Sequence, residues 1–324
     1  RGLIAVRKVA LRGLLAHKAR VLMTVVAVAL GVAFLAGVLV FTDTMNKSFD
    51  DLMETAYDGT DAVVRSEETM SGPGFGMPDP RGTMDGEVLE QVRGVDSVNA
   101  AAGEVEGMGQ LIDVDGEPMQ TGFGGPSIVV STDPEVEEAW EDITTIELNE
   151  GGWPTSDDEI VFDAATLTRS GYQLGDTAQL QTDTGVHEYT VAGTISFGGS
   201  DSAAGQSLLV LSTPEAQRVI GEPGRLDTIS VRANDDVSQE QVTADIEEVV
   251  AGSGVEVLTG EAATEEAQDE LQEALSFVTV FLLVFAVVAL VVGAFVIFNS
   301  FAIIVAQRTR EMALLRAIGA SRRQ

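Results

Sequence analysis

Two long apolar stretches interrupt an otherwise polar chain. Residues 21–41 (VLMTVVAVALGVAFLAGVLVF) carry no charge, and residues 274–306 form a second charge-free run. At ~1.5 Å per helical residue, about 20 residues cross the ~30 Å hydrocarbon core of a bilayer. A charged residue at the centre of such a helix costs ~2.5 to 3.5 kcal/mol on the insertion scale, so charge-free runs of this length are unusual in soluble domains. The pattern predicts two transmembrane helices, at 21–41 and 277–306.

Each apolar stretch continues outward as a helix with one apolar stripe. Apolar residues recur at intervals of three and four residues in 42–57 and again in 260–276, with acidic residues between them. We expect two stalk helices that pack on each other; the alternative is that each stripe packs only on the domain beside it. The predicted packing positions are Met45, Phe49 and Leu52 in the first helix and Ala267, Leu271 and Leu275 in the second.

Residues 58–259, between the stalk helices, alternate strand-like and helix-like patterns. With about 200 residues this region is large enough for two subdomains. The fold class expected is therefore a membrane protein with transmembrane α-helices, a helical stalk and an α+β domain. Strands are predicted at 61–65, 97–112, 159–163, 176–182, 187–196, 207–212, 227–233 and 255–259, helices at 84–95, 164–171, 213–221 and 238–252, and a hairpin turn at 183–185.

The charges are distributed very unevenly. The chain has 19 Lys and Arg against 51 Asp and Glu, yet residues 21–306 hold only 8 of the basic residues and 50 of the acidic ones. The positive-inside rule places the basic segments 1–20 and 307–324 in the cytoplasm and residues 58–259 outside it. A signal peptide is the alternative for the first span, but its apolar run is longer than the usual 7 to 15 residues. We expect a multi-pass protein of the plasma membrane with a large extracytoplasmic domain.

The residues that common enzyme sites need are scarce. None of the three lysines follows a glycine, so the phosphate-binding loop GxxxxGK[ST] is absent, and there are two histidines and no cysteine. Residues 113–118 (DVDGEP) resemble the start of a calcium loop but lack its later ligands, so a turn is favoured. The acidic surface repels nucleic acid. We expect no catalytic, metal or cofactor site.

Two segments resemble a known family. TREMALLRAIGASRRQ (309–324) is similar to the segment after the second membrane helix of the MacB and FtsX superfamily of ABC transporter permeases. Residues 147–196 follow the order of the MacB-like core domain: an acid-Gly turn, a strand, a short helix, a Leu-Gly-Asp turn and a hairpin ending in Val-x-Gly. The family carries further membrane helices, so the chain is expected to be part of a longer permease.

The resemblance implies a permease without its own ATPase activity. A separate ABC ATPase subunit would bind ATP, and its closure would move the outer domain for export or extraction of a substrate, which is called mechanotransmission. The expected partners are that ATPase, the lipid bilayer, and a second permease half or a second copy. Two alternatives remain open: an FtsX-like regulator of cell-wall hydrolases, and a two-span sensory receptor.

The C-terminal segment is the expected coupling site. The residues predict a short helix at 308–319 with a broad apolar surface and basic flanks, ended by a glycine. The family resemblance favours docking into the ATPase, whereas composition alone fits an interfacial helix under the lipid headgroups equally well. The predicted coupling residues are Arg308, Arg310, Glu311, Met312, Leu314, Leu315, Arg316, Ile318 and Gly319.

Overall fold

The computed structural model describes residues 18–56, 59–69, 81–120, 126–132, 143, 146–202 and 205–317. By contacts the chain divides into two compact units. One unit contains Arg1–Asn46 and Leu275–Gln324, and the other contains Lys47–Ala274.

The described part of the first unit consists of segments of two long helices, and both helices continue into the second unit. Helix α2 spans Lys18–Ala56, and α8 spans Gly260–Ala317 without interruption over 58 residues. The stretches Ala29–Lys47 and Thr279–Gln307 are long and apolar enough to cross a membrane. The predicted spans and stalk segments are thus consecutive parts of two continuous helices, and so is the predicted short helix at 308–319 as far as Ala317.

The exposed side chains of these helices are largely apolar. Val32, Phe41, Val291 and Phe298, for example, are between 52% and 73% exposed. Such a surface is what a lipid-facing helix presents. Within the two apolar stretches, Val38 and Ala286 differ from these side chains, because both are buried.

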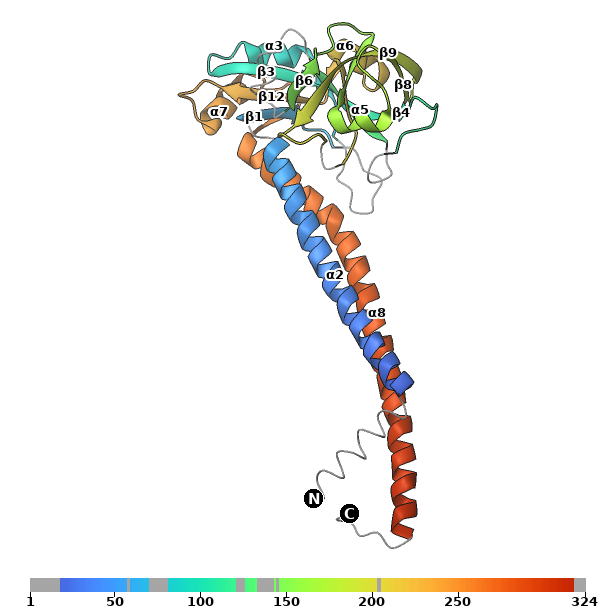
Figure 1. The fold of residues 1–324 in the computed structure, drawn as a ribbon. Helices are drawn as coiled ribbons and strands as arrows, with labels where there is room; N and C mark the ends of the chain where they lie inside the picture. Colours follow the sequence, from blue (N-terminus) through green and yellow to red (C-terminus); the bar gives the residue numbers. More distant parts are fainter. Residues whose placement is uncertain are drawn as a thin grey trace. The chain divides into compact units, whose positions relative to one another are not determined.

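The second unit contains two subdomains, seen side by side in Figure 1. The first is a four-stranded antiparallel sheet in the order β13-β1-β12-β3. Helices α3 and α7 pack on the sheet and on each other, so both cover the same face. In chain order the pattern is β-α-β-β-α-β, the arrangement of a ferredoxin-like fold. The bounds are β1 Ala62–Ser66, α3 Glu87–Arg93, β3 Val98–Glu104, β12 Thr228–Ala233, α7 Gln239–Val249 and β13 Val255–Thr259.

The other subdomain is inserted between β3 and β12. Its strands pair in the order β9-β7-β10-β5-β4-β8, and β8 pairs back to β9, so six strands close into a barrel, with β6 added on the edge of β9. The bounds are β4 Glu106–Ile112, β5 Ser127–Thr132, β6 Ile146–Gly151, β7 Glu159–Asp163, α5 Ala164–Ser170, β8 Thr177–Thr182, β9 Gly185–Phe197, β10 Leu208–Ser212 and α6 Thr213–Val219. A short pair, β2 (Met84–Asp85) with β11 (Arg225–Leu226), lies outside both sheets.

Alternation along the strands divides the core into two clusters. Ile160 and Phe162 of β7 belong to the larger cluster, and Val161 belongs to the smaller one, because neighbouring residues of a strand point to opposite faces. The smaller cluster also contains Ala102 of β3 and the buried Trp153. It therefore joins the barrel to the four-stranded sheet.

The glycines of the acid-Gly turn and of the Val-x-Gly strand, Gly151 and Gly193, lie opposite each other on paired strands. Gly151 ends β6 at φ 84°, a conformation that favours glycine, and pairs with Gly193 of β9. A Cβ at Gly193 would lie 2.6 Å from the carbonyl oxygen of Gly152 and 2.8 Å from that of Glu150. Both motif glycines therefore serve the close approach of two backbones.

Several sequence predictions need correction. The stretch 97–112 is two strands in two different sheets, and the helix predicted at 84–95 is only α3, because Met84 and Asp85 pair with β11. Strands β5 and β6 were not predicted. The hairpin at 183–185 is confirmed, since Thr182 pairs with Gly185.

Candidate functional site

The end of α8 presents the predicted coupling residues on a continuous helix. Arg310, Leu314 and Arg316 are exposed, and Leu314 is 65% exposed. The backbone at Arg308, Glu311, Met312 and Leu315 is helical, but their side chains lie outside the described residues, as do Ile318 and Gly319 entirely. The structure therefore leaves the docking prediction untested.

The predicted stalk positions are described in part. Met45 of α2 and Ala267 of α8 are half-buried. The side chains of Phe49, Leu52, Leu271 and Leu275 lie outside the described residues. Pairing of the two stripes remains a prediction.

The first turn of α8 is held by the four-stranded subdomain. The Gly260 amide donates to the carbonyl oxygen of Asp61 over 2.9 Å, and the Thr259 hydroxyl accepts from the Ala262 amide over 3.1 Å. Ala263 is buried at 2% exposure. A Cβ at Gly260 would overlap the carbonyl oxygen of Thr60, so only glycine fits this close approach.

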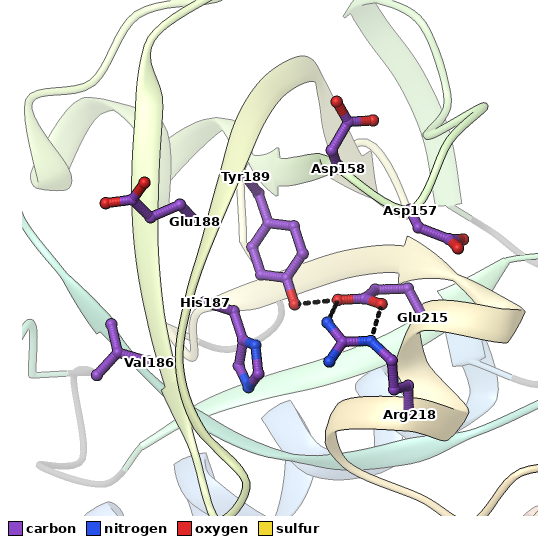
Figure 2. A pocket seen from close by; sticks show the side chains of 8 residues that line it. All are labelled: Asp157, Asp158, Val186, His187, Glu188, Tyr189, Glu215 and Arg218. Atoms are coloured by element: carbon purple, nitrogen blue, oxygen red, sulfur yellow. Dashed lines mark hydrogen bonds and ion pairs between the residues drawn. The ribbon is translucent and has the colours of Figure 1, made fainter.

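A polar concavity of about 750 Å³ lies on the barrel (Figure 2). His187 and Tyr189 leave β9 on the side of Glu215, and Val186 and Glu188 leave it on the other side, as alternation requires. The remaining lining residues are Asp157, Asp158 and Arg218.

The carboxylate of Glu215, which lines the concavity, already has hydrogen-bond partners within the protein. The carboxylate of Glu215, 2% exposed, accepts from the Tyr189 hydroxyl over 2.6 Å and from Nε of Arg218 over 2.6 Å. Burial and the neighbouring carboxylate raise the pKa of Tyr189, which keeps its hydroxyl protonated and donating. These hydrogen bonds connect α6 to β9 and use both oxygens of the Glu215 carboxylate. We therefore interpret the arrangement as structural.

The described residues hold no metal centre. No group of three or more His, Cys, Asp or Glu among them is placed to bind an ion. The loop that resembles a calcium site is a turn: the Asp113 carboxylate accepts from the amides of Asp115 and Glu117 over 3.0 and 2.9 Å, and Gly116 has φ 83°. This confirms the prediction of a turn at 113–118.

The two subdomains meet at a junction rich in carboxylates. Only Val105 separates β3 from β4, and its amide donates to the Ser131 hydroxyl over 2.9 Å. The Glu106 amide donates to the Asp227 carboxylate over 2.9 Å, where the chain returns from the barrel. Burial also raises the pKa of Glu106 and of Asp227.

Glu104 is the most perturbed carboxyl of this junction. Burial raises its pKa to about 7, and the charges of Glu106 and Asp227 act in the same direction. The Ser230 hydroxyl donates to its carboxylate over 2.7 Å and opposes the shift. The sequence contains no signal for this cluster, because Asp227 and Ser230 are more than 100 positions from Glu104 and Glu106.

Comparison with protein families finds two matches. A model described as the MacB-like periplasmic core domain matches residues 21–249. A model described as the FtsX-like permease C-terminal region matches residues 283–324. A search of curated proteins by sequence finds no match.

Two solved structures are similar to this chain. The periplasmic region of MacB from Actinobacillus actinomycetemcomitans is 13% identical with a TM-score of 0.46, over 64% of this chain and 92% of that one. The extracellular domain of YknZ, a noncanonical ABC-type transporter from Gram-positive bacteria, is 11% identical with a TM-score of 0.41, over 61% of this chain and 99% of that one.

Proposed function

Because this chain belongs to the MacB/FtsX superfamily of ABC transporter permeases, whose members work with an ABC ATPase subunit in a membrane, we propose that it transmits the motion of that ATPase to its extracytoplasmic domain. In this proposal the ATPase subunit hydrolyses ATP, and the permease works by mechanotransmission. The outer domain then moves to export or extract a substrate.

The continuity of α8 is the observation that carries the proposal. Its end lies in the FtsX-like match at 283–324, and its first turn is fastened to the four-stranded subdomain of the MacB-like match at 21–249. A helix of 58 residues is about 87 Å long, enough to cross a membrane and continue beyond it. The described helix contains no proline, the commonest cause of a sharp kink.

The charge bias supports the proposed membrane arrangement. Basic residues in 1–20 and 307–324 favour cytoplasmic ends, and the acidic residues 58–259 would lie outside. The protein would thus be a multi-pass protein of the plasma membrane. A second permease half or a second copy would complete the transporter.

The coupling end of α8 would dock into the ATPase subunit. Met312, Leu314, Leu315 and Ile318 supply apolar surface, and burying one such side chain contributes ~1.5 to 3 kcal/mol. The arginines among the predicted coupling residues would pair with carboxylates of the ATPase or with lipid phosphates. A sensory receptor is disfavoured, because the segment after its second span would signal to a kinase instead of matching an FtsX-like permease.

One substitution separates docking from lipid contact. We expect Leu315→Glu to abolish co-purification of the ATPase and its stimulation by the permease, because a carboxylate would replace an apolar docking side chain. An interfacial helix would lose lipid contact but keep its partner.

A matched control is available on the same helix. Ala313 lies about 160° around the helix from Leu315 at 3.6 residues per turn, so Ala313→Glu adds the same charge on the opposite face. Ala313→Glu should still bring down the ATPase in wild-type amounts. Docking through Leu315 is refuted if the Leu315→Glu variant also does so.

A further inference from the structure

The two long helices lead into neighbouring strands of the four-stranded sheet. Strand β1 follows α2, and β13 precedes α8; Ala62 at the start of β1 pairs with Thr259 at the end of β13. Along the chain, the barrel is reached through β3 and the return to β12. Motion that the helices pass along the chain therefore enters the four-stranded sheet before it reaches the barrel.

A ring of four charged side chains fastens α8 to this sheet. Arg65 of β1 donates from Nε to Glu256 of β13 over 2.7 Å and from a terminal guanidinium nitrogen to Glu266 of α8. Arg81 donates to the same two carboxylates, over 2.6 Å to Glu256 and 2.8 Å to Glu266. Each arginine thus bridges both glutamates, and the ring closes.

The environment of the ring strengthens its ion pairs. The four side chains are between 14% and 34% exposed, so water screens them less than it screens a fully exposed pair. Burial opposes charge on Arg65, yet its bonds to Glu266 and Glu256 raise its pKa. Burial likewise opposes charge on Glu266, and Arg65 and Arg81 still lower its pKa. Arg65 and Glu266 are therefore both held in their charged forms.

The ring lies at a distance from the first attachment of α8. The backbone contact of Gly260 with Asp61 fixes the start of the helix. Glu266 comes six residues later, about 9 Å along the helix axis. A helix held only at its first turn is free to tilt about that point, and the second attachment opposes the tilt.

We propose that the ring of Arg65, Arg81, Glu256 and Glu266 is a coupling latch, which keeps α8 aligned with the four-stranded sheet while the ATPase drives the helix. This inference rests on the proposed function. The four residues act as positioning residues: they make the sheet subdomain follow the helix, and the barrel follows the sheet.

The test measures the distance between α8 and the sheet subdomain during the ATP cycle. The chain contains no cysteine, so Asp269→Cys on α8 and Glu248→Cys on α7 give two unique sites for spin labels, both exposed. Electron-electron double resonance is recorded on the permease with its ATPase, without nucleotide and after trapping with ATP and vanadate. In the otherwise wild-type protein we expect one narrow distance distribution in both states.

Removing one charge of the ring should let α8 move relative to the sheet only when the ATPase is trapped with nucleotide. Glu266→Gln should leave ATPase binding and hydrolysis unchanged, and the distance distribution should at least double in width in the trapped state while staying narrow without nucleotide. Glu265→Gln removes the same charge from the neighbouring exposed position and should behave like the wild type. The fourfold exchange Arg65→Glu, Arg81→Glu, Glu256→Arg and Glu266→Arg restores the alternation of charge and should recover the narrow distribution.

The outcomes distinguish the latch from a merely stabilising role and from failure of the proposed function. Broadening that is equal with and without nucleotide, or no broadening at all, overturns the latch. If Glu266→Gln does not fold, Arg81→Gln opens the same ring from the other side and is judged by the same criteria. A wild-type chain that neither binds nor stimulates an ATPase refutes the proposed function itself, whatever the ring does.

Discussion

Single residues of the outer domain show how local chemistry serves long-range packing. Asp163 is 1% exposed; its carboxylate accepts from the Thr166 amide at the start of α5 and from the Leu208 amide of β10, over 2.8 and 2.7 Å. The first bond is a helix N-cap, which an Asp placed just before a helix already suggests in the sequence. The second bond joins residues 45 positions apart, which sequence does not indicate.

Glu104 makes stability depend on pH. Its folded pKa of about 7 exceeds the ordinary value of 4.5, so the folded state binds this proton more tightly than the unfolded state. The free energy of unfolding therefore falls as pH rises from about 4.5 to about 7. We expect Glu104→Gln to raise it by roughly 1 to 3 kcal/mol above pH 7 and to change it little near pH 4.5.

Thermal unfolding at pH 5 and pH 8, followed by tryptophan fluorescence, checks this expectation, since both tryptophans, Trp140 and Trp153, lie in the outer domain. Glu222→Gln removes an exposed carboxylate and is the control. An equal effect of Glu104→Gln at the two pH values would contradict the assignment.

Gly193 should be intolerant of any side chain. A Cβ there would be 2.6 Å from a backbone oxygen, so Gly193→Ala forces β6 away from β9 and should cost about 1 to 3 kcal/mol of stability. Gly152→Ala is the matched control, because a Cβ at Gly152 meets nothing within 4 Å. Comparison of the melting temperatures of the two variants decides the point; equal values would show that the strands adjust freely.

At the scale of elements, the helices were easier to predict than the strands. The periodic stripes of α7 and the cap at Ser238 indicate a helix, and the structure has one at Gln239–Val249. The run Ile128-Val129-Val130 in β5 is β-branched and would have supported a strand. No such signal marks the break at Val105 between β3 and β4. Its position depends on the pairing of these strands in two different sheets.

The stalk prediction belongs to this scale. We expect cysteines at positions 49 or 52 of α2 to form disulfides with cysteines at 267, 271 or 275 of α8, because paired stripes bring Cα atoms within ~7 Å. Cysteines at Asp50 and Asp269, which lie on the opposite faces of the two helices, serve as the off-stripe control. Absence of crosslinks at every register would refute the pairing.

At the scale of the whole molecule, charge bias predicts the membrane topology. Arg20→Cys, Gln120→Cys and Ala320→Cys place single cysteines in a chain that has none. In intact cells an impermeant maleimide should label only position 120, since the other two would be cytoplasmic. After lysis all three should react. Labelling of position 20 or 320 before lysis would reverse the proposed orientation.

The sequence by itself indicated two candidate spans, the charge asymmetry, most turns and helices, and the resemblance to the family. These properties depend on residues close together in the chain or on simple sums over a segment. The tertiary structure alone decided that the barrel is inserted into a ferredoxin-like sheet, that β8 closes on β9, and that four charges form a ring. Arg65 and Glu266 are 201 positions apart, and no periodicity links residues at that separation. Only strand pairing, which is set by packing between distant segments, brings them together.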